Sequence, residues 1–206
     1  MERQPKYMGI RKDVANGYLS RCQLILANLR EEANGANVNV QVANVLALIG
    51  KVVVFRWEIR SEEDRLELKS TMVRVRAEFE ETIKTFSEPF DQIVVASLKG
   101  MLDELEAGLV ETRGPGGAGD LLDWSSSVDF EMEILDPRDE IHYALTGLRN
   151  LGREVPEEIR SKLGALDQEL KSLLPDAIDC FRRDGQTMRW RVTASSDEMW
   201  WRLAAD

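Results

Sequence analysis

Apolar side chains recur every three or four residues along the first half of the chain, which is the period of an α-helix that buries one face. Four such stretches predict four long helices, at residues 10–29, 38–60, 62–86 and 90–109. The third is the best defined, because Ser61 precedes an acidic turn in the manner of a capping box. Helices with short connections pack antiparallel, so residues 1–112 are predicted to form a helical bundle.

The second of these stretches allows one alternative. Val38, Val40 and Val42 alternate with polar residues, as in a β-strand. We favour helix because the alternation stops at Val42 while the helical spacing continues, but residues 37–43 leave both readings open.

Glycine and proline cluster after the fourth stretch and predict a linker at residues 113–127. Within it, the amino acids at residues 114–119 match the dinucleotide-binding pattern G-x-G-x-x-G. The pattern follows a helix where that motif requires a strand, and Pro115 removes an amide that a phosphate would need. A flexible linker between two domains is the interpretation we prefer.

The second half opens with an alternation of apolar and acidic residues at 128–134, which is typical of a half-buried strand. A similar alternation of apolar residues and arginines occupies residues 188–193. If the two strands pair antiparallel, the acidic residues of one lie opposite the arginines of the other. We therefore expect a small sheet with one charged face.

Apolar residues at helical spacing predict two helices between these strands, at residues 136–152 and 156–183, and one after them, at residues 195–203. Pro175 is expected to kink or interrupt the middle helix. The predicted fold class is therefore mainly α: an N-terminal antiparallel bundle of four long helices, then a small α+β unit at residues 128–206 with the order strand, helix, helix, strand, short helix.

The net charge of −10 favours solubility and disfavours binding to the phosphate backbone of nucleic acids or to anionic lipid. No apolar run is long enough to span a bilayer and no signal-peptide pattern opens the chain, so we expect a cytoplasmic protein without a membrane partner. Cys22 and Cys180 lie on predicted apolar helix faces, where a free thiol behaves as a small hydrophobic group.

Catalytic and metal signatures are sparse. Asp139 and His142 lie three residues apart on a predicted helix, a spacing used by carboxylate-bridged metal sites, but His142 is the single histidine of the chain. No nucleophile elbow or cysteine cluster is present. We therefore expect no catalytic residue, no metal site and no cofactor.

The C-terminal segment is the most distinctive part, because it combines tryptophan with arginine, the pairing enriched at interaction hot spots. The residues predicted to contact a partner are Arg189, Trp190, Arg191, Trp200 and Trp201. Packing inside the protein is the alternative reading. Adjacent tryptophans on a helix cannot both point the same way, which keeps the choice between a partner surface and core packing open.

These observations favour a non-enzymatic regulatory or adaptor protein whose partner is another protein, with homo-oligomerisation left open. The alternative is an acidic inhibitor, similar in action to an antitoxin, that neutralises a basic partner through the eight acidic residues between Asp120 and Glu140. A carboxylate-based, metal-dependent enzyme is the third class considered.

Overall fold

The computed structural model describes residues 9–31, 37–57, 59, 61–86, 89–113, 130–183, 185 and 199–203. It is mainly helical, as the sequence predicts. The described residues group into two compact units: an N-terminal unit within residues 9–100 and 141–156, and a C-terminal unit within residues 101–140 and 157–203. Two long helices, α4 (Phe90–Arg113) and α6 (Asp136–Asn150), contribute to both.

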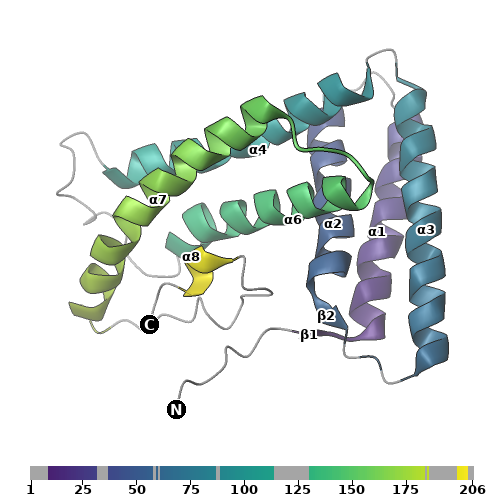
Figure 1. Cartoon of the computed structure of the whole chain (residues 1–206), viewed down its shortest axis with the longest axis horizontal. Helices are drawn as coiled ribbons and strands as arrows, with labels where there is room; N and C mark the ends of the chain where they lie inside the picture. The colour runs from purple at the N-terminus through teal and green to yellow at the C-terminus, as the bar shows by residue number, and fades with distance from the viewer. Residues whose placement is uncertain are drawn as a thin grey trace. The chain divides into compact units, whose positions relative to one another are not determined.

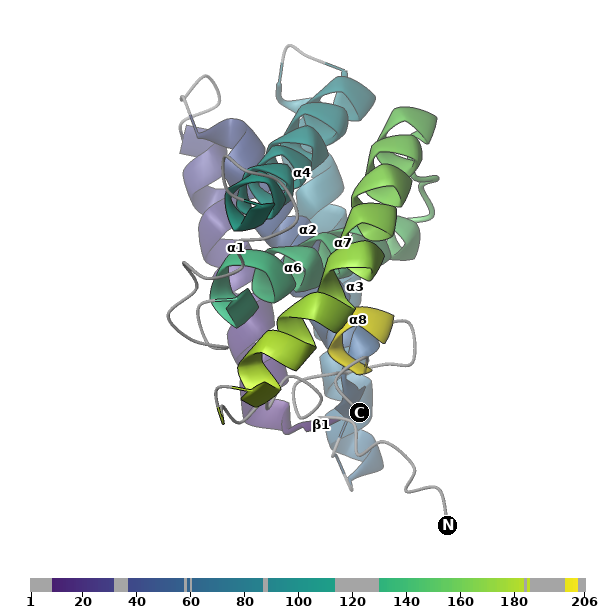
Figure 2. The same cartoon turned by 90° about the vertical axis from the view of Figure 1, so that its left-hand side faces the viewer.

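Three helices form most of the N-terminal unit: α1 (Lys12–Glu31), α2 (Val38–Val54) and α3 (Glu62–Lys84). They lie side by side, with α1 packed against both others (Figures 1 and 2). The Oγ of Ser61 accepts a hydrogen bond from the backbone N–H of Asp64 at 3.3 Å, which confirms the predicted cap of α3. Residues 38–43 are helical, which settles the open choice at this segment.

The second predicted helix is too long. It ends at Val54, after which Phe55 is extended and Arg56–Trp57 form a short strand, β2. This strand pairs in parallel with β1 (Gly9–Ile10), placing Gly9 opposite Arg56 and Ile10 opposite Trp57. The backbone of Phe55 still donates to Lys51 of α2, whereas Arg56 and Trp57 pair with the start of the chain, and this pairing overrides the helical spacing that continues to residue 60.

Two glycines allow α2 and α6 (Asp136–Asn150) to cross at very close range. A Cβ atom on Gly147 would lie 2.0 Å from the carbonyl oxygen of Leu46, and one on Gly50 would lie 1.8 Å from that of Tyr143. No other residue fits at these positions without moving a backbone. Past this crossing α6 ends at Asn150, and Gly152, two residues on, has a φ of 73°, which suits the left-handed residue that follows a helix C-terminus.

The C-terminal unit contains the second half of α4 (Phe90–Arg113), the π-helical turn η2 (Glu131–Leu135), the start of α6, α7 (Glu157–Arg183) and α8 (Trp200–Leu203). Lys162 on α7 bridges Asp103 and Glu106 on α4, each at 2.6 Å. Phe130 packs edge-on against Phe181, with 5.9 Å between ring centroids. α7 runs through Pro175 as one helix, so the proline does not interrupt it.

The predicted strand at residues 128–134 is wrong, because residues 130–135 are helical and lead directly into α6. Phe130 and Ile134 are buried one helical turn apart, whereas Met132, between them, is 52% exposed. A series of apolar residues at every second position also has an apolar residue at every fourth position, which is close to the helical period. Here the residues four positions apart are the ones that pack in the core. The partner strand at residues 188–193 lies outside the described residues.

The glycine-rich segment also lies almost entirely outside the described residues, so the predicted linker and the domain division at residues 113–127 stay predictions. None of the described helices combines the length and apolar character needed to cross a membrane.

Candidate functional site

The short helix α8 is held in place by side chains that point into the C-terminal unit. A four-residue helix has no stability of its own, so its position must come from tertiary contacts. Met199, Trp201 and Arg202 are all buried, and Arg202 is only 1% exposed. An arginine buried to that extent requires charged partners.

Three carboxylates surround Arg202, and with it they form what we call the Arg202 network. Its Nη2 donates to Asp139 Oδ2 at 2.7 Å and its Nε donates to the same oxygen at 3.0 Å. Nη1 donates to Glu131 Oε1 at 2.5 Å, and Nη2 also bonds to Asp136. The guanidinium therefore ties α8 to both η2 and the first turn of α6.

Trp201 also holds α8 in place, through a hydrogen bond and a cation–π contact. Its Nε1 donates to Asp139 Oδ1 at 2.7 Å, so that the carboxylate receives hydrogen bonds from two consecutive residues of α8. The guanidinium of Arg138 lies 3.8 Å from the centroid of the Trp201 ring, a cation–π contact. Arg138 is itself held by Asp167 of α7 through two hydrogen bonds, of 2.7 and 3.0 Å.

Burial and neighbouring charges shift the pKa values of Asp139 and Arg202 in opposite directions. Burial raises the pKa of Asp139 to about 6, although Arg202 and the Trp201 N–H both favour its ionised form. Burial also opposes the charge of Arg202, but the carboxylates of Asp139 and Asp136 outweigh it and raise the pKa of the guanidinium. Arg202 therefore stays charged, while Asp139 takes up a proton more readily than an ordinary aspartate does.

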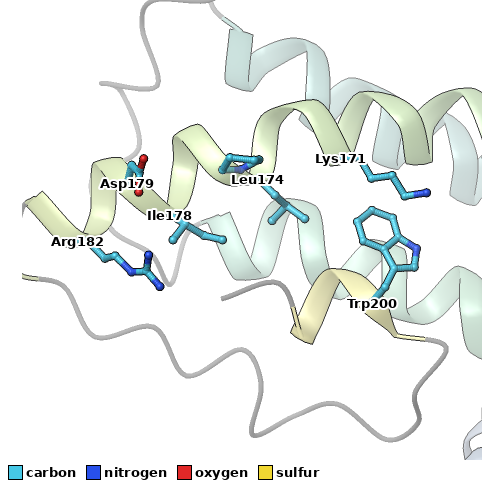
Figure 3. A pocket seen from close by; sticks show the side chains of 7 residues that line it. Lys171, Leu174, Ile178, Asp179, Arg182 and Trp200 are labelled. Atoms are coloured by element: carbon cyan, nitrogen blue, oxygen red, sulfur yellow. The ribbon is translucent and has the colours of Figure 1, made fainter. Parts of the chain in front are cut away.

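A groove opens on the other side of α8, between it and α7 (Figure 3). Its volume is about 360 Å³, within the lower range of ligand pockets. We call it the α7–α8 groove and define it by the residues that line it: Lys171, Leu174, Pro175, Ile178, Asp179, Arg182 and Trp200.

The groove has an apolar floor and a mixed rim. Leu174 and Ile178 are buried at its base, and Trp200 of α8 is half-buried at its side. Lys171, Asp179 and Arg182 are exposed. The Nζ of Lys171 lies 4.9 Å from the centroid of the Trp200 ring, so the cation covers part of the indole.

The five residues predicted to contact a partner divide into three groups. Arg189, Trp190 and Arg191 lie outside the described residues. Trp201 belongs to the buried anchor of α8, where it is 1% exposed, and Trp200 lines the α7–α8 groove. The structure thus places the two adjacent tryptophans in different environments.

Sequence reasoning missed most of the groove and the Arg202 network. Glu131 was expected to face an arginine, but across a strand pair; it pairs with Arg202 of α8 instead. The helical spacing predicted at residues 156–183 includes Ile178 but not Leu174, and it gave no signal that either residue borders a groove. The spacing of Lys171, Leu174, Ile178 and Arg182 on one helix was the available clue.

The candidate metal pair offers little support for metal chemistry. The carboxylate of Asp139 is bonded to Trp201 and Arg202, and His142 is buried. Across the part of the chain that the structure describes, no three His, Cys, Asp or Glu side chains are grouped so that they could hold a metal ion.

Comparison with known proteins gives no indication of family or function. The chain matches no protein-family model, no curated protein and no solved structure.

Proposed function

We propose that this protein is a non-enzymatic interaction module that binds a segment of another protein in the α7–α8 groove. The observation that carries the proposal is the position of Trp200, which lines the groove while its neighbour Trp201 is fully buried. Tryptophan at the side of a pocket with an apolar floor is the arrangement typical of binding hot spots.

The buried contacts that anchor α8 support the same proposal. Arg202 and Trp201 fix the helix from the buried side, so Trp200 is positioned before any partner arrives. A side chain ordered in advance loses little conformational entropy on binding, and this raises affinity without any further contact.

The polar groups of the C-terminal unit support a structural role over a catalytic one. Asp139 accepts hydrogen bonds from Trp201 and Arg202, and Asp167 accepts two from Arg138. Carboxylates held in this way orient the helices around them, and their oxygens are already occupied by donors of the protein itself.

The alternative, an acidic neutraliser of a basic partner, has less support. Three of the acidic residues between Asp120 and Glu140, namely Glu131, Asp136 and Asp139, are ion-paired with Arg202. Arg202 offsets one of these three negative charges, which reduces in part the field that this stretch would present to a basic partner.

Photo-crosslinking in the native cells tests the proposal. A photoreactive amino acid replaces Asp179 at the groove rim, and a matched control carries it at Glu63, an exposed acidic residue on α3. We expect one protein to cross-link from position 179 and none from position 63, and the adduct to disappear when Trp200→Ala is added. Adducts that are the same from both positions, or unaffected by Trp200→Ala, would contradict the proposal.

A further inference from the structure

The π-helical turn η2, which leads into α6, contains one residue more than an α-helical turn. The backbone N–H of Asp136 donates to the carbonyl of Glu131, five residues back, where an α-helix would use the carbonyl of Met132. In an α-helix, side chains five positions apart point in directions about 140° apart. In the π turn these two residues are one turn apart, so Glu131 and Asp136 lie on the same side of the helix.

The position of Glu131 decides whether the Arg202 network is complete. Glu131 accepts a hydrogen bond from Nη1 of Arg202, and Asp136 accepts one from Nη2. Among the described residues, Glu131 is the acceptor that Nη1 contacts. Because Arg202 is only 1% exposed, water cannot replace a lost bond at Nη1 unless α8 moves. An α-helical register in η2 would therefore turn Glu131 away from Arg202 and weaken the attachment of α8.

Pro137 opposes the α-helical register. Proline has no backbone N–H, and inside a helix its ring collides with the carbonyl group four residues back, which here belongs to Glu133. The carbonyl oxygen of Glu133 lies against α4 at Gly108, where a Cβ atom would be 2.7 Å from it. Pro137 on one side and the space at Gly108 on the other therefore both favour the π turn.

We infer that the π turn η2, held by Pro137, positions the α7–α8 groove, because it keeps Glu131 on Arg202 and so keeps Trp200 at the side of the groove. A shift of η2 to the α-helical register would loosen α8 and weaken binding without any change in the residues that line the groove. The effect on binding rests on the proposed function, whereas the attachment of α8 does not depend on it.

Hydrogen exchange in the full chain measures the attachment of α8 without a partner. The backbone N–H of Arg202 donates to the carbonyl of Met199 at 3.0 Å, so its exchange rate, followed by NMR, reports the opening of α8. We expect Pro137→Ala and Glu131→Ala each to speed this exchange about tenfold or more. Pro89→Ala, at an exposed proline ahead of α4, is the control and should leave the rate unchanged. An unchanged rate in either folded variant, Pro137→Ala or Glu131→Ala, would overturn the inference.

A one-residue deletion distinguishes a change of register from a general loss of stability. Deletion of Met132, which is 52% exposed, from the Pro137→Ala variant leaves Glu131 four residues before Asp136. That spacing returns the two carboxylates to one side of an α-helix. We expect the deletion to restore the exchange of the Arg202 amide to within about threefold of the wild-type rate. Exchange that stays fast, or becomes faster still, would mean that Pro137 does not act through the register and would overturn the inference.

Photo-crosslinking from position 179 connects the turn to binding. We expect Pro137→Ala to lower the yield of the adduct and the added deletion of Met132 to recover it. An adduct unaffected by Pro137→Ala would overturn the link between the turn and the groove. If exchange follows the register but the wild-type turn gives no adduct from position 179, the proposed function fails while the role of the turn in holding α8 stands.

Discussion

Trp200 and Trp201 are neighbours on α8, yet their rings stand nearly perpendicular, at 89° with 5.6 Å between centroids, and face different surroundings. Trp201 donates to the buried carboxylate of Asp139, while Trp200 lines the α7–α8 groove. Consecutive residues of a helix point in directions about 100° apart, so one anchors the helix and leaves the other available for contact.

Replacement of the two tryptophans should separate stability from binding. Trp201→Ala removes a fully buried ring and leaves Asp139 with one donor fewer, and we expect it to lower the free energy of unfolding by about 3–5 kcal/mol. Trp200→Ala truncates a half-buried ring and is expected to cost about 1 kcal/mol or less. Chemical denaturation followed by circular dichroism measures both; equal losses would contradict the assignment of the two environments.

The Arg202 network should be a major source of stability for the position of α8. Arg202→Ala leaves Glu131, Asp136 and Asp139 without their shared cation, and we expect a loss of about 3–5 kcal/mol. The control is Arg160→Ala, which breaks an exposed ion pair with Glu157 and should cost no more than about 0.5 kcal/mol. If the two variants unfold at the same denaturant concentration, the network does not anchor α8.

The protonation of Asp139 should make stability depend on pH in a defined direction. Its pKa rises from 3.8 to about 6 on folding, so the folded state binds a proton more tightly than the unfolded state. The stabilising contribution is complete below about pH 4 and is lost as the pH rises through 6, with a total size of about 3 kcal/mol. Wild type should therefore lose stability relative to Asp139→Asn between pH 4 and 7.

Nuclear magnetic resonance provides the direct check. The carboxyl carbon of Asp139 is expected to titrate with a midpoint near 6. A midpoint below its ordinary value of 3.8 would mean that Arg202 and Trp201 outweigh burial, and the direction of the pH dependence would then reverse.

Alanine substitutions at two glycines of the N-terminal unit should have opposite effects on stability, because Gly147 lies at the crossing of α2 and α6 and Gly17 does not. Gly147→Ala places a methyl group against the carbonyl of Leu46 and should destabilise the protein by about 1–3 kcal/mol or more. Gly17→Ala, in the interior of α1 with no atom within 4 Å of the new methyl group, should stabilise it by about 0.5–1 kcal/mol. Thermal unfolding of the two variants distinguishes the sites, and a stabilised Gly147→Ala would contradict the close crossing.

The helices were predictable where the apolar spacing and a cap agreed, as at Ser61 for α3. Individual burial was less predictable: the helical spacing predicted at residues 10–29 does not tell that Val14 is 36% exposed while Leu19 and Leu26 are buried. One helix can carry several sets of apolar residues spaced three or four positions apart. The positions of the neighbouring helices decide which set is buried.

The failures at residue 55 and at residues 130–135 have the same physical origin. A strand pair with Gly9–Ile10 ends α2, and the burial of Phe130 and Ile134 selects helix over strand. Both outcomes depend on contacts between residues far apart in sequence, which local patterns do not contain. The Arg202 network and the α7–α8 groove depend on such contacts too, so the sequence offered Trp200 as a candidate without locating the groove.

The most direct test of the central claim is a binding measurement with the partner segment identified by cross-linking from the groove. Titration calorimetry compares the full chain with its Trp200→Ala variant, whose folding is verified separately. We predict that Trp200→Ala weakens binding by at least about 30-fold, the loss expected for a hot-spot tryptophan. An unchanged dissociation constant for a folded Trp200→Ala variant would contradict the claim that the α7–α8 groove is the binding site.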